Sequence, residues 1–274
     1  MVIEFSRHLN AILEVDPEAR TARVQPGVIL TDLQKVAAAH GLRFGPDPSS
    51  QARATLGGLI GNNACGPHAV SYGHTAAQVI SLDVVDARGR RFTARAGDLS
   101  PVPGLAELVQ ANLATIRTEF ARFSRQLSGY SLEHLLPENG ADLAKFLVGT
   151  EGTLVTVLEA TVRLVPLATS PVLLALGYAD MPSAADAVPA MLRHDVLAVE
   201  GLDAELVDVV RQHKGDHAVP DLPEGAGWLL IEVGGDLTLD GTLDGQGVGD
   251  VSEHLAVRAA RRAALQHSHV LAAV

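Results

Sequence analysis

The sequence has 274 residues, of which 47% are hydrophobic and 19% charged, so the chain can build a sizeable core and is not disordered as a whole. A net charge of −11 with only 4% aromatic residues excludes a basic or base-stacking surface for nucleic acid and argues against anionic lipid. The single cysteine, Cys65, excludes an internal disulfide and a four-cysteine metal or iron–sulfur site.

The length favours one large or two small domains, at roughly 150 residues per domain. The first residues lack the apolar stretch of a signal peptide, and no run of 18 apolar residues occurs, so no membrane span is predicted. These features together lead us to expect a cytoplasmic protein.

The first part of the chain predicts two short strands, VIEF (2–5) and ARTARVQPG (19–27), and then a helix over 31–40. Thr31 has the position of an N-cap with Gln34 three residues on, and Gly41 suits the left-handed position after the last turn. One face of this helix is expected to hold Leu33, Val36 and Ala37.

Residues 44–75 show no persistent apolar period and are rich in glycine, serine, asparagine and proline, with almost no charge. A stretch of this length without regular structure is usually functional or disordered, and the composition predicts a binding surface made of backbone. Glycine lets the backbone approach a flat or anionic ligand, and consecutive amides can cradle a phosphate without lysine. The alternative is a structural bundle of loops in which the glycines serve turns.

Regular structure is predicted to return with a hairpin of strands at 79–86 and 91–94, followed by a helix over 104–127. Asn139 is expected to cap a short helix that runs through Phe146. The run Gly149–Leu154 places two glycines around Glu151 before a strand. It indicates either a backbone exposed to a ligand, with Glu151 bonding locally to hold the loop, or an ordinary turn.

After Pro166 the pattern alternates between strands (171–179, 196–203, 227–235) and helices (182–194, 203–213), which predicts a separate α+β domain. Residues 236–250 have the composition of a loop, and a helix is expected over 252–274.

His213 and His217 lie one helical turn apart, a spacing that metal sites use, but Gly215 interrupts the helix and no third ligand is evident, so no metal site is predicted. Neither G-x-G-x-x-G nor G-x-x-x-x-G-K-[ST] occurs, which argues against a classical dinucleotide-binding or P-loop site.

Three further side chains are open to two readings. Cys65, with His68 three residues on, is either a thiol–base pair or, as we favour, a small buried residue. Arg125 and Tyr130 either reach a ligand or are a surface arginine and a packed tyrosine.

Seven spaced runs resemble, in order, the FAD-linked oxidases of the vanillyl-alcohol oxidase family, which carry a PCMH-type FAD-binding domain. The resemblance is greatest to the D-2-hydroxyacid dehydrogenase branch, which includes D-lactate, glycolate and D-2-hydroxyglutarate dehydrogenases, some of them fused to iron–sulfur modules. The runs are VQPGV (24–28), FGPDPSS (44–50), ATLGGLIGNNACG (54–66), SYGHT (71–75), VISLDVVD (79–86), SGYSLEHLLPENG (128–140) and FLVGTEGTLVTVLEATVRLVP (146–166).

The resemblance implies an α+β fold: a PCMH-type FAD-binding domain over 1–168, incomplete at its N-terminus, then the start of a ferredoxin-like α+β cap domain over 169–235 and an unassigned tail over 236–274. Family members carry a Gly-rich pyrophosphate loop before the first of these runs. They also continue, past the position that corresponds to residue 235, through the rest of the cap and a C-terminal segment that holds the histidines and carboxylate serving as base or metal ligands. The chain is therefore expected to be a fragment, and no catalytic residue is assigned.

The resemblance further implies FAD as cofactor, a small 2-hydroxy acid as substrate and hydride transfer to the flavin. An iron–sulfur electron-transfer partner or module is one option that the branch offers, and the electron acceptor is left open. The alternatives are a catalytically inactive fragment and a nucleotide-binding module without redox activity. The residues that match the family's flavin-contacting runs are Pro46, Asp47, Ser49, Ser50, Thr55, Gly57, Gly58, Gly61, Asn62, Asn63, Tyr72, Gly73, Glu151, Gly152 and Thr153.

Overall fold

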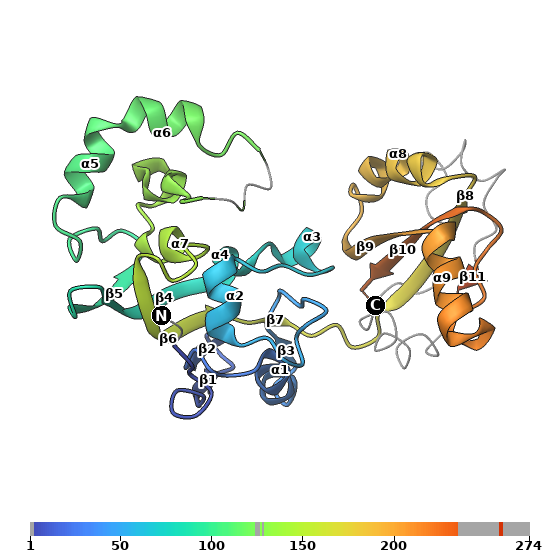
Figure 1. Cartoon of the computed structure of the whole chain (residues 1–274), viewed down its shortest axis with the longest axis horizontal. Coiled ribbons are helices and arrows are strands. Elements are labelled where there is room, and N and C mark those ends of the chain that lie inside the picture. Colours follow the sequence, from blue (N-terminus) through green and yellow to red (C-terminus); the bar gives the residue numbers. More distant parts are fainter. Residues whose placement is uncertain (1–2, 124–126, 128, 235–257, 260–274) are drawn as a thin grey trace. The chain divides into compact units, whose positions relative to one another are not determined.

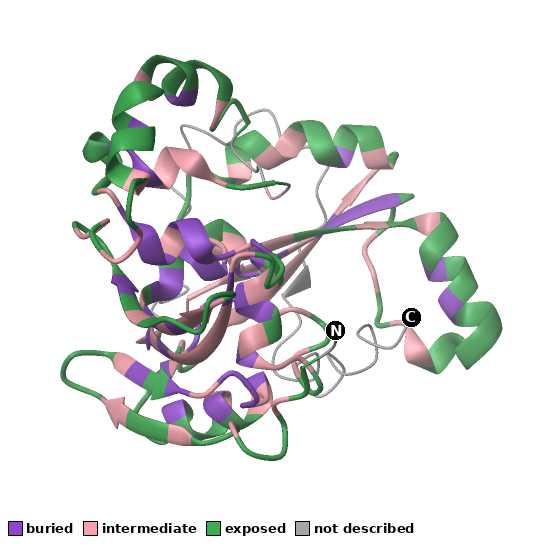
Figure 2. Cartoon of the chain, turned by 60° about the vertical axis from the view of Figure 1, so that its left-hand side comes forward, coloured by how far each residue is buried: buried purple, intermediate pink, exposed green. Residues whose placement is uncertain are grey.

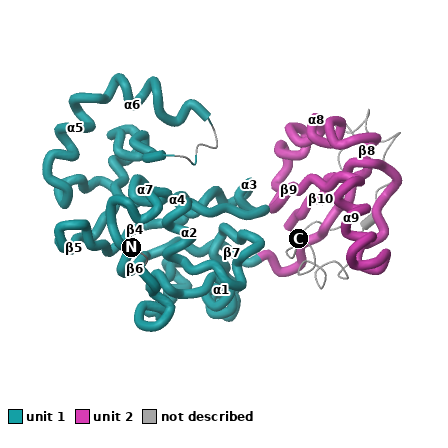
Figure 3. Tube along the Cα trace, in the orientation of Figure 1, with its two compact units in different colours: residues 1–167 teal, residues 168–274 magenta. Residues whose placement is uncertain are grey.

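The computed structural model describes residues 3–123, 127, 129–234 and 258–259 (Figure 1). The chain divides into two compact units, Met1–Leu167 and Ala168–Val274 (Figure 3). Each unit combines helices with antiparallel sheet, so the predicted α+β class is confirmed. No helix among the described residues is both long and apolar enough to span a bilayer.

The first unit is built on a five-stranded sheet with the order β1-β2-β6-β4-β5. Ala160 lies opposite both Val24 and Leu82, and Leu82 lies opposite Ala94, so one row of buried side chains crosses the sheet on its core face. The strands are β1 (Ile12–Asp16), β2 (Thr21–Val24), β4 (Val79–Asp86), β5 (Arg91–Arg95) and β6 (Val155–Arg163), with a separate pair β3 (Leu42–Arg43) and β7 (Val165–Pro166).

Short helices cover the core face of this sheet. Contacts run from α2 through α4 and α7 to strands β4 and β5 (Figure 1). Figure 2 shows buried residues in bands between exposed ones, as expected for elements that each present one apolar face. The helices are α1 (Leu30–Ala38), α2 (Leu56–Asn62), α3 (Ala69–Tyr72), α4 (Thr75–Gln78), α5 (Leu105–Ala111), α6 (Leu113–Glu119), η1 (Leu132–Leu135), η2 (Pro137–Asn139) and α7 (Leu143–Leu147).

The predicted cap of the first helix is wrong. Helix α1 begins at Leu30, one residue before Thr31, because its first amides are satisfied by backbone: Leu30 N donates to Ala54 O and Thr31 N to Gln51 O. Gln34 instead bonds both backbone groups of Phe44, at 3.0 and 2.9 Å.

The face predicted for α1 is only partly right. Leu33 and Ala37 are buried, whereas Val36 is 41% exposed. Gly41 has φ +68°, so the left-handed position predicted for it is confirmed.

Residues 44–75 are more regular than predicted, because they contain α2, α3 and α4. Leu56, Leu59 and Ile60 of α2 are buried in the core, and the Thr55 hydroxyl caps the helix by accepting from Gly58 N at 3.2 Å. Tertiary burial thus stabilises a helix that its glycines alone would disfavour.

Three other predictions for this unit need correction. Residues 3–5 of VIEF form no strand, and strand β1 at Ile12–Asp16 was not predicted. The helix expected over 104–127 is two helices, α5 and α6, that meet at Asn112, and α6 ends at Glu119. Asn139 lies in η2, and the cap of α7 is Asp142, which accepts from Lys145 N at 3.0 Å.

The second unit has a sheet of order β11-β8-β10-β9, and the alternation of strands and helices predicted for residues 171–235 is confirmed. Helix α8 packs on the sheet face that carries Leu176, Leu229 and Ile231. The elements are β8 (Val172–Tyr178), α8 (Met181–Met191), β9 (Val196–Asp203), α9 (Ala204–Lys214), η3 (Asp216–Ala218), β10 (Gly227–Val233) and β11 (Arg258–Ala259).

An aspartate caps each of the helices α8 and α9 in the described part of this unit. Asp180 Oδ1 accepts from Ser183 N at 2.8 Å and Asp203 Oδ1 from Leu206 N at 2.7 Å. Strand β11 lies inside the helix expected over 252–274, so that prediction is wrong at these two residues, and its remainder lies outside the described residues, as does the loop expected over 236–250.

Candidate functional site

A pocket of about 620 Å³ opens in the first unit where the segment 48–65 folds around α2. Its volume lies in the range of small-molecule sites, roughly 300–1,000 Å³. Five residues predicted to contact flavin line it: Ser50, Thr55, Gly58, Asn62 and Asn63. The other lining residues are Pro48, Arg53, Ala54, Leu59, Ala64, Cys65 and Leu127.

The glycines of α2 divide into two kinds. A Cβ on Gly57 would lie 2.6 Å from Pro26 Cβ, so this glycine lets the helix pack against the turn at 26–28. A Cβ on Gly58 would meet only the Thr55 hydroxyl, at 3.3 Å, and one on Gly61 would meet nothing within 4 Å. Gly58 and Gly61 therefore leave space beside the helix that a ligand can use.

The first amides of α2 are not available to a ligand. Leu56 N donates to Val28 O, Gly57 N to Pro26 O and Gly58 N to the Thr55 hydroxyl. The expected phosphate cradle of consecutive amides is therefore not formed here. The amides of Ser49 and Ser50, both exposed residues, donate to no residue that the structure describes.

Asn62 and Asn63 end the helix differently. Asn62 is exposed at the pocket. Asn63 is the left-handed C-cap, at φ 51°, and its side-chain oxygen accepts from Ala76 N at 2.9 Å. Asn63 thus joins α2 to α4, and Asn62 is the asparagine whose amide faces outward.

The loop 149–153 packs directly on the end of α2, so the two glycine-rich motifs of the sequence lie side by side. Gly149 N donates to Ile60 O at 2.8 Å and Glu151 N to Gly61 O at 2.9 Å. Glu151 is held at φ 55° between Gly149 and Gly152, which also have positive φ. A non-glycine residue in this conformation is uncommon and is found most often in turns and at functional sites.

The side chains of this loop point to different roles. The Glu151 carboxylate is exposed and makes no hydrogen bond or ion pair within the described part of the chain, so the expected local bond is formed by its amide instead. Thr153 Oγ1 donates to Thr150 O and shares a 2.9 Å hydrogen bond with the Tyr130 hydroxyl, whose ring packs edge-on to Phe146. Tyr130 is 44% exposed, and its hydroxyl and ring connect the loop to Phe146.

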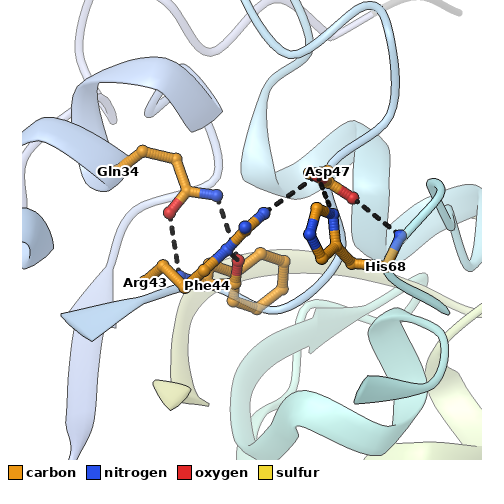
Figure 4. A network of polar contacts seen from close by, with 5 residues as sticks. All are labelled: Gln34, Arg43, Phe44, Asp47 and His68. Atoms are coloured by element: carbon orange, nitrogen blue, oxygen red, sulfur yellow. Dashed lines mark hydrogen bonds and ion pairs between the residues drawn. The ribbon is translucent and has the colours of Figure 1, made fainter. Parts of the chain in front are cut away.

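Asp47 has partners within the protein. Its Oδ2 accepts from Arg43 Nη2 at 2.9 Å and lies 2.6 Å from His68 Nδ1, and its Oδ1 accepts from His68 N at 3.3 Å (Figure 4). Pro46 beside it is buried. Of the predicted contact residues at 46–50, the two serines are therefore the ones open to a ligand.

Tyr72 and Gly73 belong to the segment that faces Asp47. The Tyr72 ring stacks on His68, with centroids 6.0 Å apart and planes within 9°. The Arg43 guanidinium lies 6.0 Å from the centre of the same ring. Gly73 has φ +77° and ends α3.

The remaining candidates do not assemble a site. His213 lies in α9 and His217 in η3, with Gly215 between them, and the described residues hold no cluster of three potential metal ligands. Cys65 lines the pocket at intermediate burial, and Arg125 lies outside the described residues. Sequence reasoning missed Arg53, although it is one of only two charged residues in 44–75.

Two family models match the chain in order. Residues 1–95 match "FAD binding domain" and residues 168–269 match "FAD linked oxidases, C-terminal domain". The chain therefore contains segments of an FAD binding domain and of the C-terminal domain of FAD linked oxidases. FAD is the cofactor that both matches support, in agreement with the resemblance of the sequence.

Relatives agree with this assignment. The chain is 33% identical over 258 residues to D-2-hydroxyglutarate dehydrogenase of Pseudomonas putida, covering 86% of the chain and 26% of that protein. It is 36% identical over 233 residues to glycolate oxidase subunit GlcD of Bacillus subtilis, covering 84% of the chain and 41% of that protein. The chain thus spans between a quarter and two fifths of these relatives.

A solved structure supports the fold. Alkyldihydroxyacetonephosphate synthase superposes with a TM-score of 0.63 at 17% identity, over 97% of this chain and 45% of that one. The residues in and next to the pocket fit a flavin dinucleotide. Gly58 lines the pocket, and Gly61 on the same helix also leaves open space, which suits a flat ring system; Arg53 is the charged residue among the lining residues.

Proposed function

We propose that this chain supplies the FAD site of a dehydrogenase for a small D-2-hydroxy acid, with an iron–sulfur module or partner as electron acceptor. The observation that carries the proposal is the pocket around α2, which lies in the unit that contains the segment matching an FAD binding domain. The relatives' names share a 2-hydroxy acid as substrate. Bound FAD would supply the redox chemistry by accepting a hydride from the carbon that bears the substrate hydroxyl.

The residues of the pocket have separate tasks in this proposal. Gly58 and Gly61 let a flat ring approach the backbone of α2, and Asn62 offers an exposed amide beside it. The amides of Ser49 and Ser50 and the guanidinium of Arg53 bind the diphosphate, because amide donors and arginine are the groups that recognise phosphate oxygens.

FAD titration of the purified full chain tests the proposal. We expect saturable quenching of flavin fluorescence with FAD and competition by ADP, and weaker binding of FMN, which lacks the adenylate half. Adding a D-2-hydroxy acid to the complex should bleach the visible flavin absorbance under anaerobic conditions. A chain that binds no FAD would contradict the whole proposal, whereas binding without bleaching would leave only a nucleotide-binding module.

A pair of arginine variants tests the site itself. Arg53→Ala should weaken FAD and ADP binding about tenfold and make the affinity less dependent on salt, because one charge-assisted contact is lost. Arg88→Ala removes the same charge at an exposed turn between β4 and β5 and serves as the control. Equal effects of the two changes would refute a direct role for Arg53.

A further inference from the structure

Three polar side chains meet at low exposure next to the segments that line the pocket. The exposed fractions of the Arg43, Asp47 and His68 side chains are 16%, 12% and 9%. Asp47 directly precedes Pro48 of the pocket, and His68 follows Cys65 of the pocket by three residues. The cluster therefore joins two stretches of chain that each contribute to the pocket wall.

Asp47 uses both of its carboxylate oxygens within this cluster. Oδ2 bonds Arg43 and the His68 ring, and Oδ1 accepts from the His68 backbone amide (Figure 4). An ionised carboxylate only accepts hydrogen bonds, and Arg43 is always charged, so His68 Nδ1 carries the hydrogen and donates it. Buried, charge-assisted hydrogen bonds of this kind are strong and leave a costly unpaired group when one member is lost.

The two stretches also approach each other closely at two glycines. A Cβ on Gly66 would lie 2.4 Å from the carbonyl carbon of Asp47, and a Cβ on Gly45 would lie 2.7 Å from Tyr72 Cβ. Such close approach is possible only at glycine. The polar contacts of Asp47 with His68 join the two stretches at this close approach, so we expect their spacing to depend on these contacts.

We propose that Asp47, held by Arg43 and His68, is a positioning residue that fixes the 45–50 stretch against the 64–72 stretch and so sets the shape of the pocket wall for FAD. This inference rests on the proposed FAD site and changes the part assigned to Asp47. Its carboxylate acts on the cofactor through Ser49, Ser50 and the pocket wall. It does not contact the cofactor itself.

Asp86 provides a matched control in the same unit. Its carboxylate also accepts three hydrogen bonds, from Arg88 N, Arg90 N and Arg90 Nε, at 2.8–2.9 Å. It stabilises the turn between β4 and β5, whose residues do not line the pocket at α2. Asp86 also forms an ion pair with Arg90 Nη2 at 2.7 Å, so Asp86→Asn removes one negative charge from a carboxylate that is bonded at least as extensively as Asp47.

The test measures two properties of the full chain at a temperature where every variant is folded. Hydrogen–deuterium exchange of the chain without FAD should speed up in both 45–50 and 64–72 for Asp47→Asn, and only near the turn for Asp86→Asn. FAD affinity should fall about tenfold for Asp47→Asn and change less than about twofold for Asp86→Asn.

Histidine variants keep the test decisive where Asp47→Asn fails to fold. His68→Ala removes the ring donor and should behave like Asp47→Asn. His68→Asn keeps an N–H at the position of Nδ1 and should restore both the slow exchange and the FAD affinity to within about twofold of the unchanged chain. If His68 only filled space, His68→Asn would not restore the slow exchange and the FAD affinity that His68→Ala loses.

Each outcome decides the inference. Faster exchange in only one stretch, or unchanged FAD affinity in Asp47→Asn and His68→Ala, would overturn it while leaving the FAD site intact. No FAD binding by the unchanged chain would instead overturn the proposed function, and the part of the inference that concerns affinity would fall with it. The exchange data would still show whether Asp47 joins the two stretches.

Discussion

Replacing Gly61 by alanine separates the stability of α2 from its proposed contact with FAD. The new Cβ would meet nothing within 4 Å, so the change costs no steric energy in the folded chain. Alanine is favoured over glycine in a helix by up to about 1 kcal/mol. In a unit of this size 1 kcal/mol raises the melting temperature by roughly 2–4 °C, so we expect a rise within that range.

The same methyl group would occupy the space beside α2 that the flavin ring is proposed to use. We therefore expect FAD affinity to fall about tenfold, while the chain without FAD becomes more stable. Thermal unfolding followed by circular dichroism measures the first quantity, and fluorescence titration with FAD measures the second. A rise in melting temperature together with a fall in FAD affinity is informative, because a variant with a damaged fold would lose both stability and affinity.

Thr118→Ala is the control for Gly61→Ala. Thr118 lies in α6, and its hydroxyl bonds back to Ala114 O, so alanine should also raise helix stability, by about 0.5 kcal/mol. FAD affinity should not change in this variant. Unaltered FAD affinity in Gly61→Ala would refute a close approach of the ring to this part of α2, and a lower melting temperature would refute the open space around Gly61.

Three other measurements test the fold. Leu82→Ala, at a position with no exposed surface in the central sheet, should lower the free energy of unfolding by about 2–5 kcal/mol in urea denaturation. The bidentate contact of Arg117 lowers the pKa of Glu138 to about 2. The contribution of this contact to the stability of the fold should therefore be present above pH 4.5 and be lost as the pH falls toward 2. NMR titration of Arg117→Gln should show that the pKa of Glu138 returns toward 4.5. Burial lowers the pKa of His134 below 6.5, so the folded state disfavours the charged form of this side chain. The free energy of unfolding should therefore decrease as the pH falls through and below 6.5, and His134→Gln should remove that decrease.

The second unit shows what local sequence signals can predict. Strand β8 is a run of apolar residues broken only by a glycine. Asp180 and Asp203 cap the starts of α8 and α9, and Gly215 follows the last residue of α9. Each of these signals acts through bonds within a few residues of its own position, so the element follows without knowledge of the rest of the chain.

The first unit shows where such signals fail. Thr31 and Asn139 have the right residue type for helix caps, yet backbone carbonyls at Gln51 and Ala54 satisfy the start of α1, and Asp142 caps α7. Partners that are distant in sequence, or a competing side chain three residues on, decide these ends. A propensity scale contains neither kind of information.

Helix α2 carried a signal that the glycine content obscured. Leu56, Leu59 and Ile60 have helical spacing, and Thr55 precedes them in the position of a cap. The composition of the whole stretch 44–75 hides this short periodic segment, because irregular residues flank it on both sides. The binding surface expected over 44–75 stays a prediction, and the position of the pocket depends on how the chain folds around α2.

The glycines of the first unit that are discussed above divide into those that packing requires and those that leave open space. Gly45, Gly57 and Gly66 are required by the chain's own packing, since a Cβ at each would lie within 2.7 Å of another atom. Gly58 and Gly61 are not required in this way, and each costs helix stability relative to alanine. A glycine that packing does not explain, in a helix that it weakens, is best explained by a ligand that needs the space, and this places the proposed contact on the outer side of α2.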